Sequence, residues 1–404
     1  MSPQQTRVCV VGGGPAGMML GLLLARSGID VTVLEKHADF FRDFRGDTIH
    51  PSTMEVLDEL GMLDDLLKLP HQEIRQLAGQ VGDTKLNLAD FTHLPVRRKF
   101  LVIMPQWDFL NFLSEKARAY PGFHAEMETP VTGLTFSGEQ VTGVRCGGPN
   151  GERTIATDLV IGADGRDSTV RQAGGLKPED FGAPMDVLWM RISRDPHDPS
   201  QLLGRIDYGQ IFVMIERGDY WQCGLVVPKG SFAEIKERGL AALRDDIRRL
   251  APFLGDRVND LREWNDVKLL TVQVDRLRSW HRPGLLCIGD AAHAMSPIGG
   301  VGINLAIQDA VAAANILGPA LKNGGVPSTA VLEEVQKRRE LPTRVTQRAQ
   351  LLIQNAVITR VLGRRDKKMS PPWIIRAFAG VPLLRRIPAR LVGLGFRREH
   401  VGRI

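Results

Sequence analysis

RVCVVGGGPAGMMLGLLLARSGIDVTVLEK, from Arg7 to Lys36, reads as a strand, a glycine turn, a helix and a second strand. Val8 to Val11 is an apolar, β-branched run that leads directly into a G-x-G-x-x-G turn. In that turn Gly12 permits the tight bend, Gly14 lets a pyrophosphate approach the backbone, and Gly17 lets the helix pack closely on the strand. The stretch therefore predicts a dinucleotide-binding unit.

The two ends of this unit supply further contacts. The helix expected from Pro15 to Ser27 directs free N–H groups and the positive end of its dipole at the pyrophosphate, so Pro15 and Ala16 belong to the predicted site. Glu35, followed by Lys36, closes the second strand about 20 residues past the glycines. An acid at this place accepts hydrogen bonds from ribose hydroxyls and disfavours a 2′-phosphate.

Length and composition favour a globular protein of two domains. A chain of 404 residues exceeds a single core, so a small-molecule site between two domains is expected. We find no run of about 18 apolar residues that predicts a transmembrane helix. The four cysteines lie far apart in mostly apolar runs, which predicts buried thiols in a reducing cytoplasm and neither disulfides nor a metal site. They are Cys9, Cys146, Cys223 and Cys287.

The net charge of +6 is unevenly distributed. Residues 336–404 carry 17 Lys and Arg but three acids, a charge of +14, so the remainder carries −8. Aromatic residues are sparse in this tail and no nucleic-acid motif occurs, so nucleic acid is not an expected partner. Charge balance within the chain, an acidic partner subunit and an anionic membrane surface remain open, and we expect at most weak, salt-sensitive membrane association.

Hydrophobic patterning extends the prediction along the chain. Ser52 and Glu55 have capping-box spacing before a helix that ends at Gly61. Alternating runs from 181 to 274 indicate a mostly antiparallel sheet with one covered face, interrupted by helices. The other expected elements are a helix at 107–119, a hairpin or small meander at 131–161, a buried strand at 284–288, a helix at 302–317 and predominantly helical structure from 329 onwards.

Two more strand-to-turn elements place an acid beside a glycine: Asp164-Gly165 and Gly289-Asp290. With them the chain resembles the FAD-dependent aromatic hydroxylases, the single-component flavoprotein monooxygenases of the p-hydroxybenzoate hydroxylase type. The resemblance covers about the first 340 residues. Its motifs are GGGPAG at Gly12–Gly17, ADGRDSTVR at Ala163–Arg171 and GDAAHAMSPIGGVGIN at Gly289–Asn304.

The resemblance implies an α/β (α+β) fold: an FAD-binding Rossmann-like domain, an inserted, mostly antiparallel substrate domain and a helical C-terminal region. The FAD-binding domain would comprise residues 1–72, 99–180 and 275–335. The substrate domain would comprise residues 73–98 and 181–274, and the basic helical region residues 336–404.

The resemblance also assigns roles to matching residues. Glu35 would bind the adenosine ribose and Arg45 the FAD phosphates, while Gln106 and Asp290 would lie near the ribityl chain. Asp164 would belong to a motif used for both FAD and the nicotinamide cofactor. The residues expected along the isoalloxazine are Pro297, Gly299, Gly300, Gly302, Ile303 and Asn304. A helix beginning after Gly302 would also direct its N–H groups at the ring and stabilise an anionic reduced flavin.

The implied chemistry is reduction of non-covalently bound FAD by a transient NADH or NADPH, capture of O2 as a flavin hydroperoxide, and transfer of one oxygen to the substrate. Pro297, Gly299 and Gly300 are the catalytic candidates, with Tyr208 as a possible partner of a phenol hydroxyl or a packed strand tyrosine. Apolar residues that could line the site or simply form core are Trp189, Met190, Phe212, Met214 and Trp221. His293 is expected to be a structural hydrogen-bonding residue.

The implied substrate is an aromatic, polyketide-like or quinone-like small molecule, and the enzyme a monomer or homodimer. Three other kinds of flavoprotein are alternatives. A halogenase of this fold carries a W-x-W-x-I-P segment, which this sequence lacks. A reductase of prenyl or lipid-like substrates stays open because apolar residues lie among the basic ones in the tail. A non-catalytic FAD-binding protein is disfavoured by the intact Pro297–Asn304 segment.

Overall fold

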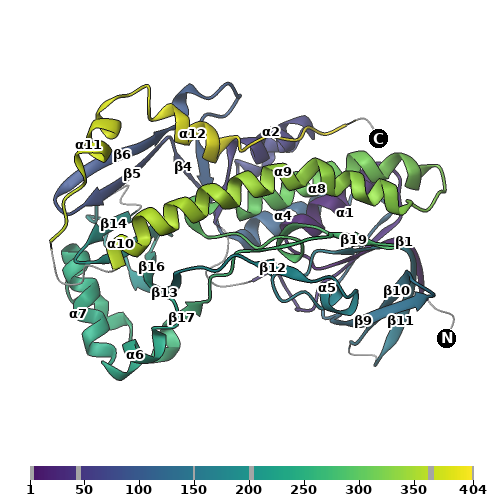
Figure 1. The fold of residues 1–404 in the computed structure, drawn as a ribbon, viewed down its shortest axis with the longest axis horizontal. Helices are drawn as coiled ribbons and strands as arrows, with labels where there is room; N and C mark the ends of the chain where they lie inside the picture. The colour runs from purple at the N-terminus through teal and green to yellow at the C-terminus, as the bar shows by residue number, and fades with distance from the viewer. Residues whose placement is uncertain (1–3, 42–46, 149–150, 200–203, 363–367, 403–404) are drawn as a thin grey trace.

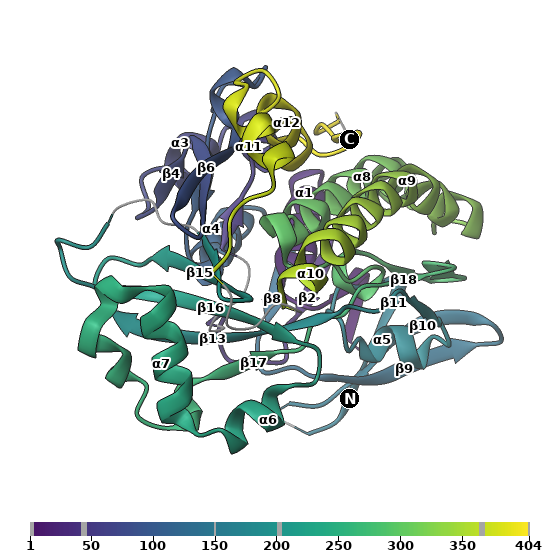
Figure 2. The same cartoon turned by 60° about the vertical axis from the view of Figure 1, so that its left-hand side comes forward.

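Two sheets lie side by side in the computed structural model, and a pair of long helices extends along the molecule (Figure 1). The structure describes residues 4–41, 47–148, 151–199, 204–362 and 368–402. A view turned by 60° separates the two sheets and places the C-terminal helices above them (Figure 2).

The first sheet is built around the N-terminal unit. Its strand order is β19-β20-β11-β1-β2-β8, with β9 and β10 attached through β11. The core pairings β20–β11, β11–β1, β1–β2 and β2–β8 are all parallel. The strands are β1 (Gln4–Val11), β2 (Val31–Leu34), β8 (Phe123–Glu126), β9 (Val131–Ser137), β10 (Gln140–Cys146), β11 (Arg153–Gly162), β19 (His281–Arg282) and β20 (Leu285–Cys287). The expected meander is present as antiparallel β9, β10 and β11.

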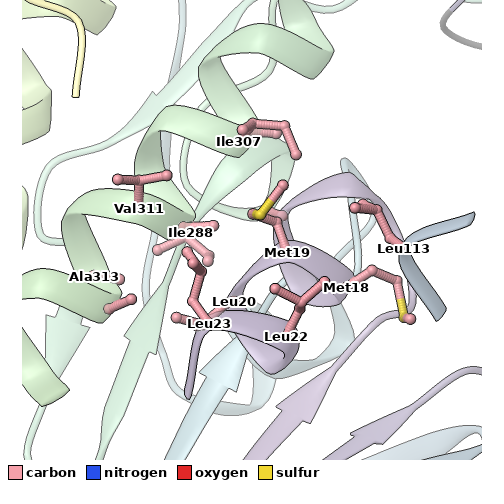
Figure 3. Packing of buried hydrophobic residues seen from close by; sticks show 14 of the residues in the cluster. Met18, Met19, Leu20, Leu22, Leu23, Leu113, Ile288, Ile307, Val311 and Ala313 are labelled. Carbon is pink, nitrogen blue, oxygen red and sulfur yellow. The ribbon is translucent and has the colours of Figure 1, made fainter. Parts of the chain in front are cut away.

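Helix α1 (Pro15–Arg26) packs against α8 (Gly302–Lys322) and α4 (Gln106–Ala117), and together they cover this sheet. Met19, Leu23 and Ile307 lie in the shared apolar cluster (Figure 3). Because α1 is apolar on nearly all sides, it is buried along most of its length. The N-termini of α1 and α8 are therefore held in fixed positions relative to the ends of the strands.

Short elements connect this domain to the second sheet. Strands β3 (Thr48–Ile49), β7 (Leu101–Ile103) and β4 (Gln72–Ile74) form a three-stranded sheet, and β12 (Pro178–Asp180) pairs with β18 (Asp275–Leu277). The helices of this region are α2 (Pro51–Glu59), α3 (Leu63–Leu66), η1 (Phe91–His93) and α5 (Thr169–Ala173).

The second sheet has the order β17-β13-β16-β15-β14-β5-β6. Its neighbours are antiparallel except β14 and β5, which pair in parallel. The strands are β5 (Gln76–Val81), β6 (Thr84–Asp90), β13 (Met185–Ser193), β14 (Gly204–Asp207), β15 (Gln210–Glu216), β16 (Tyr220–Pro228) and β17 (Lys268–Leu270). The predicted, mostly antiparallel sheet is thus confirmed. The hairpin β5–β6, about 100 residues earlier in the sequence, completes it.

One face of this sheet packs under α6 (Phe232–Glu237), α7 (Leu240–Leu250) and η2 (Pro252–Asp260). The opposite face turns towards the first domain, where Trp189 and Val226 lie in a cluster with Ile298. Successive side chains of a strand point to opposite faces. Only every second residue of each strand can therefore meet a ligand held between the domains.

The C-terminal region is helical, as expected. It contains α9 (Thr329–Ile353), a π-helical turn at Gln354–Ile358, α10 (Thr359–Leu362), α11 (Trp373–Gly380) and α12 (Arg386–Gly393). Helix α12 packs on β6 and η1. All four cysteines are buried thiols, as predicted.

One expectation about membrane segments requires correction. The helical stretch Ile298–Lys322 has the length and hydropathy of a membrane span, contrary to the sequence analysis, and 78% of its apolar window is buried inside the protein. A core helix produces the same pattern, because the small apolar residues of α8 pack against α1.

Candidate cofactor and active site

The glycine turn leaves open space at one of its three glycines. Gly12 has φ +109°, and a Cβ there would lie 2.3 Å from the carbonyl oxygen of Ala163. A Cβ on Gly17 would lie 2.0 Å from the carbonyl oxygen of Gly12. A Cβ on Gly14 would meet no atom within 4 Å. Gly12 and Gly17 are therefore required by the protein's own packing, whereas Gly14 borders space that a pyrophosphate can occupy.

Two helix N-termini meet at this edge of the sheet. The α1 helix begins at Pro15 after Gly14, and α8 begins at Gly302 after Val301; within the described chain, neither has a side-chain cap. The two helices pack against each other, and parallel strands β1, β11 and β20 all end on their side of the sheet. Uncapped amides and two positive dipole ends fit a phosphate at α1 and electron-rich ring oxygens at α8.

Glu35 braces the glycine turn. Its Oε2 accepts a hydrogen bond from Gly13 N at 3.0 Å, and its Oε1 accepts one from His37 N at 3.1 Å. The carboxylate is thus held beside the turn, where a ribose would lie, and Lys36 next to it is exposed. Arg45, the expected phosphate contact, lies outside the described residues.

The two acidic turns differ in what their carboxylates contact. Asp164 accepts from Ser168 Oγ at 2.5 Å and from Val170 N at 3.1 Å, so it caps the start of α5, and burial raises its pKa. The Asp290 side chain is 35% exposed and lies 3.2 Å from Nε of Arg166. Asp290 is therefore the more accessible of the two carboxylates to a bound ligand.

The segment from Pro297 to Asn304 turns sharply before α8. Gly299 and Gly300 have φ +78° and +62°, and a Cβ on Gly300 would lie 2.9 Å from Thr48 Oγ1. Glycine at 300 therefore permits both the turn and the close approach of β3. Gly302 borders open space, whereas the side chain of Ile303 is buried in the apolar core, so only its backbone can reach a ligand.

Two hydroxyl groups at the start of α2 hold the end of this segment. The Oδ1 of Asn304 accepts from Ser52 Oγ at 2.8 Å and from Thr53 Oγ1 at 2.7 Å. The predicted capping box at Ser52 and Glu55 is wrong: His50 is the N-cap of α2, and the Ser52 hydroxyl points to Asn304 and to the carbonyl of Gly393, 3.1 Å away. Sequence reasoning missed this link because its partners are about 250 positions apart.

His50 also connects this segment to the C-terminal region. Its Nε2 lies 2.9 Å from the carbonyl oxygen of Gly300, and its Nδ1 lies 2.7 Å from that of Val392. The ring is fully buried, and burial lowers its pKa although both carbonyl contacts act to raise it. The basic tail is thereby attached directly to the loop that carries the catalytic candidates.

Asp47, directly before β3, links the three-stranded sheet to the second sheet. Its carboxylate lies 2.6 Å from Nη2 of Arg217 and accepts from Nε2 of Gln222 at 2.6 Å. All three side chains are buried, and burial raises the pKa of Asp47 while Arg217 opposes that shift. Gln106 is half-buried and begins α4, three residues after the end of β7.

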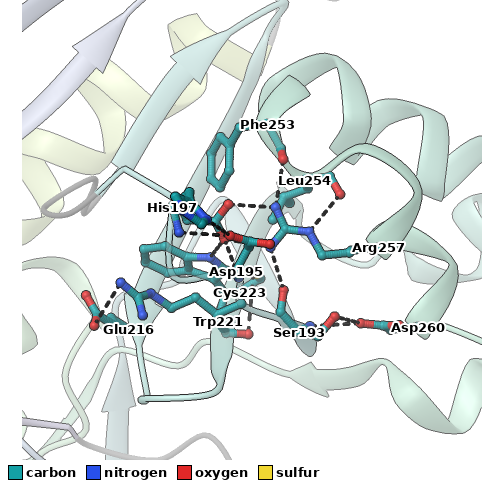
Figure 4. A network of polar contacts seen from close by, with 12 residues as sticks. Ser193, Asp195, His197, Glu216, Trp221, Cys223, Phe253, Leu254, Arg257 and Asp260 are labelled. Atoms are coloured by element: carbon teal, nitrogen blue, oxygen red, sulfur yellow. Dashed lines mark hydrogen bonds and ion pairs between the residues drawn. The ribbon is translucent and has the colours of Figure 1, made fainter.

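Most of the suggested apolar walls lie on the far face of the second sheet. Met190, Phe212, Met214 and Trp221 belong to the cluster under α6, α7 and η2. The indole of Trp221 donates to Asp198 at 2.8 Å, and Asp198 also accepts two bonds from Arg257. Trp221 and Arg257 lie in one polar network on this side of the sheet (Figure 4). These four side chains form core, which leaves Trp189 facing the first domain.

Tyr208 lies in a turn and not in a strand. It connects β14 and β15 with φ +49°, and the guanidinium of Arg249 on α7 lies 5.6 Å from its ring centre. These neighbours belong to the helix-covered edge of the second sheet. A role for Tyr208 beside a substrate hydroxyl stays a prediction.

His293 belongs to a buried charge network behind the glycines. Its Nε2 lies 2.6 Å from Asp309, which also accepts from Gly289 N at 3.1 Å and from Arg339 Nε at 2.9 Å. Burial acts to raise the pKa of Asp309, but His293 and Arg339 hold it below its usual value. Arg339 in turn contacts Glu399 at 3.2 Å. The histidine is structural, as expected.

Comparison with known proteins agrees with this geometry. A family model described as "FAD binding domain" matches residues 5–349. The chain belongs to the family of FAD-dependent aromatic monooxygenases. A 6-methylpretetramide 4-monooxygenase of Streptomyces rimosus is 37% identical over 350 residues, which covers 86% of this chain and 83% of the relative.

A para-nitrophenol 4-monooxygenase of Pseudomonas sp. (strain WBC-3) is 26% identical over 346 residues, 81% of each chain. A solved structure of PqsL from Pseudomonas aeruginosa, in complex with 2-aminobenzoylacetate, has a TM-score of 0.75 at 21% identity and covers 89% of this chain and 99% of that one. The protein is thus an FAD-dependent monooxygenase, and the uncapped α1 and α8 termini fit its cofactor.

Proposed function

We propose that this monooxygenase hydroxylates an aromatic, polyketide-like small molecule, with NADH or NADPH as reductant and O2 as oxygen donor. The observation that carries the proposal is the contact of Ile298 with the inner face of the second sheet, where Trp189 and Val226 lie. The loop before α8 and an apolar face of the second sheet thus meet in one place. The similarity to a 6-methylpretetramide 4-monooxygenase supports a polycyclic substrate.

The chain's residues would divide the work between binding and orientation. The α1 amides with Gly12 and Gly14 would hold the FAD pyrophosphate, Glu35 its adenosine ribose, and Asp290 the ribityl chain. The amides of Gly302, Ile303 and Asn304 would face the ring, with Pro297, Gly299 and Gly300 along it. When bound, FAD supplies the electron transfer and the oxygen activation, while the apolar inner face orients substrate and excludes water.

Oxygen uptake with both nicotinamide cofactors tests the proposal, on a panel of phenols, quinones and polycyclic aromatic polyketides. We expect substrate-stimulated uptake and one atom of labelled dioxygen in the product. Gly14→Val, which should not bind FAD, is the inactive control. Reduction of a prenyl lipid without oxygen consumption, or NAD(P)H oxidation that yields only hydrogen peroxide across the panel, would favour a different activity.

A further inference from the structure

The buried face of α9 is polar, although the helix packs on the protein interior. From Gln336 onwards, its buried positions follow helical spacing and, apart from Pro342, carry amide, guanidinium or hydroxyl groups. They are Gln336, Arg339, Thr343, Gln347, Gln350 and, in the adjoining π-helical turn, Gln354. A buried amide is costly unless its hydrogen bonds are satisfied, so this stripe indicates a specific set of partners.

Those partners are mostly backbone groups of the segment that leads to the active-site loop. Gln336 accepts from Trp280 N and donates to Arg278 O. Gln347 donates to the carbonyls of Asp275 and Ala294. The stripe therefore follows the chain from β18 to the loop and holds it by its main chain.

Gln350 makes the most concentrated set of these bonds, on both sides of Pro297. Its Oε1 accepts from Ser296 N at 3.2 Å. Its Nε2 donates to Ser296 O at 2.9 Å and to Ile298 O at 2.8 Å. One side chain, 4% exposed, thus fixes both residues that flank the proline.

Proline makes such an outside contact necessary. Pro297 has no N–H, so its own amide cannot anchor the loop, and the next residue in a left-handed conformation is Gly299, which is intrinsically mobile. Two amide donors and one acceptor on a rigid helix replace the missing restraint. The far end of the loop is held independently, by His50 and by the Ser52 and Thr53 hydroxyls.

We propose that Gln350 is a positioning residue of the monooxygenase reaction, which fixes Pro297 and Ile298 between the flavin and the substrate face. This inference rests on the proposed function of the loop. Its main effect would be on the orientation of the loop and not on the stability of α9. A displacement of about 1 Å at such a site can cost on the order of 100-fold in rate.

Gln350→Met and Gln336→Met form a matched pair, since both remove a buried backbone-binding amide from the same helix face, and Gln336 acts far from Pro297. Urea unfolding midpoints should fall in both variants. The absorption change of bound FAD on substrate addition, and the fraction of consumed oxygen recovered as hydroxylated product, should fall by roughly 10-fold or more in Gln350→Met alone. Equal effects in the two variants, or none in Gln350→Met, would overturn the proposal.

Gln350→Glu supplies a second measurement. The carboxylate keeps one acceptor but loses both donors and faces two carbonyls; once protonated it regains one donor, and burial should raise its pKa. The measured quantity is the fraction of consumed oxygen that is recovered as hydroxylated product, relative to wild type. We expect this fraction to rise in Gln350→Glu as pH is lowered and to stay constant in Gln350→Met. No recovery would contradict positioning by donation. If the wild type bound a compound but hydroxylated none, the proposed function would fail. The absorption change of bound FAD on addition of that compound would still test the role of Gln350.

Discussion

The Nε2 atom of His50 lies 2.9 Å from the carbonyl oxygen of Gly300, in the loop that precedes α8. The other ring nitrogen contacts the carbonyl of Val392, so one imidazole joins the N-terminal domain, the loop before α8 and the C-terminal region. Two carbonyl acceptors favour a charged ring, but full burial disfavours it, and the pKa of His50 is lowered.

This lowered pKa predicts a loss of stability on acidification. Unfolded His50 takes up a proton near its ordinary pKa of about 6.5, whereas the folded ring stays neutral, so the unfolded state binds more protons as pH falls. The contribution of neutral His50 to stability is therefore fully present above about pH 6.5 and is lost as the pH falls from there towards the lower pKa of the folded state. Urea midpoints of wild type and His50→Gln at about pH 8 and about pH 5.5 check this. A difference between the two proteins that is the same at both pH values would contradict it.

The glycines of the turn should respond differently to substitution. Gly14→Val should fold with an unchanged unfolding midpoint in the absence of FAD but lose FAD binding, because its side chain enters space that no protein atom occupies. Gly17→Ala should lower the midpoint itself, since its Cβ would meet the Gly12 carbonyl at 2.0 Å. Thermal melts of the apoproteins and fluorescence titration with FAD separate the two effects. A destabilised Gly14→Val apoprotein would argue against the open space.

Asp290→Ala should weaken FAD binding by roughly 1.5 to 3 kcal/mol, the typical loss for a hydrogen bond to a charged group. Its carboxylate is accessible and held by Arg166, so the substitution removes an acceptor without opening the core. Asp164→Asn offers a contrast, since that carboxylate caps α5 and should affect mainly folding. FAD dissociation constants and unfolding midpoints of both variants would decide, and wild-type affinity in Asp290→Ala would refute the assignment.

The buried network predicts a large stability difference within one helix. Arg339, 1% exposed, contacts both Asp309 and Glu399, and its loss leaves Asp309 with His293 and Glu399 with Arg338 as their remaining cationic partners. Arg339→Met should lower the free energy of unfolding by about 3 kcal/mol, the lower end for loss of one partner of a buried ion pair. Arg344→Met breaks only a surface pair with Glu340 at 3.7 Å and should cost about 0.5 kcal/mol or less. Equilibrium urea unfolding compares them directly.

The N-terminal unit could be predicted from local sequence because each of its features is local. A β-branched run, three glycines at fixed spacing and a terminal acid determine strand, turn and helix without reference to the rest of the chain. The antiparallel texture of the second sheet followed from alternation in the same way. Which face of this sheet the helices cover could not be predicted, because alternation distinguishes two faces but does not say which one is covered. Trp221 and Trp189, which lie on opposite faces, are therefore both candidate wall residues in the sequence.

The supports of the active-site loop could not be predicted for a different reason. His50, Ser52 and Thr53 reach Gly300 and Asn304 across about 250 residues, and Gln350 reaches Ser296 across 54. Such pairs carry no spacing signal, and Ser52 had an attractive local explanation as a cap. A polar stripe on a buried helix face was the one visible clue, since Gln336, Gln347 and Gln350 occupy positions where apolar residues are usual.

The C-terminal surface yields a final prediction. Trp373 is 76% exposed, and Leu383, Ile387 and Leu391 are also exposed. On α12, Arg386 and Arg390 are exposed beside Ile387 and Leu391, since Pro388 lies in the first turn of the helix and does not break it. Cationic and apolar groups thus share one outward face.

Such a face is suited to anionic lipid, but α12 is only eight residues long and is packed on β6, which limits the depth of insertion. We expect weak binding to anionic vesicles at low ionic strength, reduced further in Arg386→Gln/Arg390→Gln. At about 0.5 M salt, charges are screened within roughly 5 Å and binding should disappear. Vesicle flotation measures both. Tight binding that persists in high salt would show apolar insertion and would make a lipid-like substrate the better proposal.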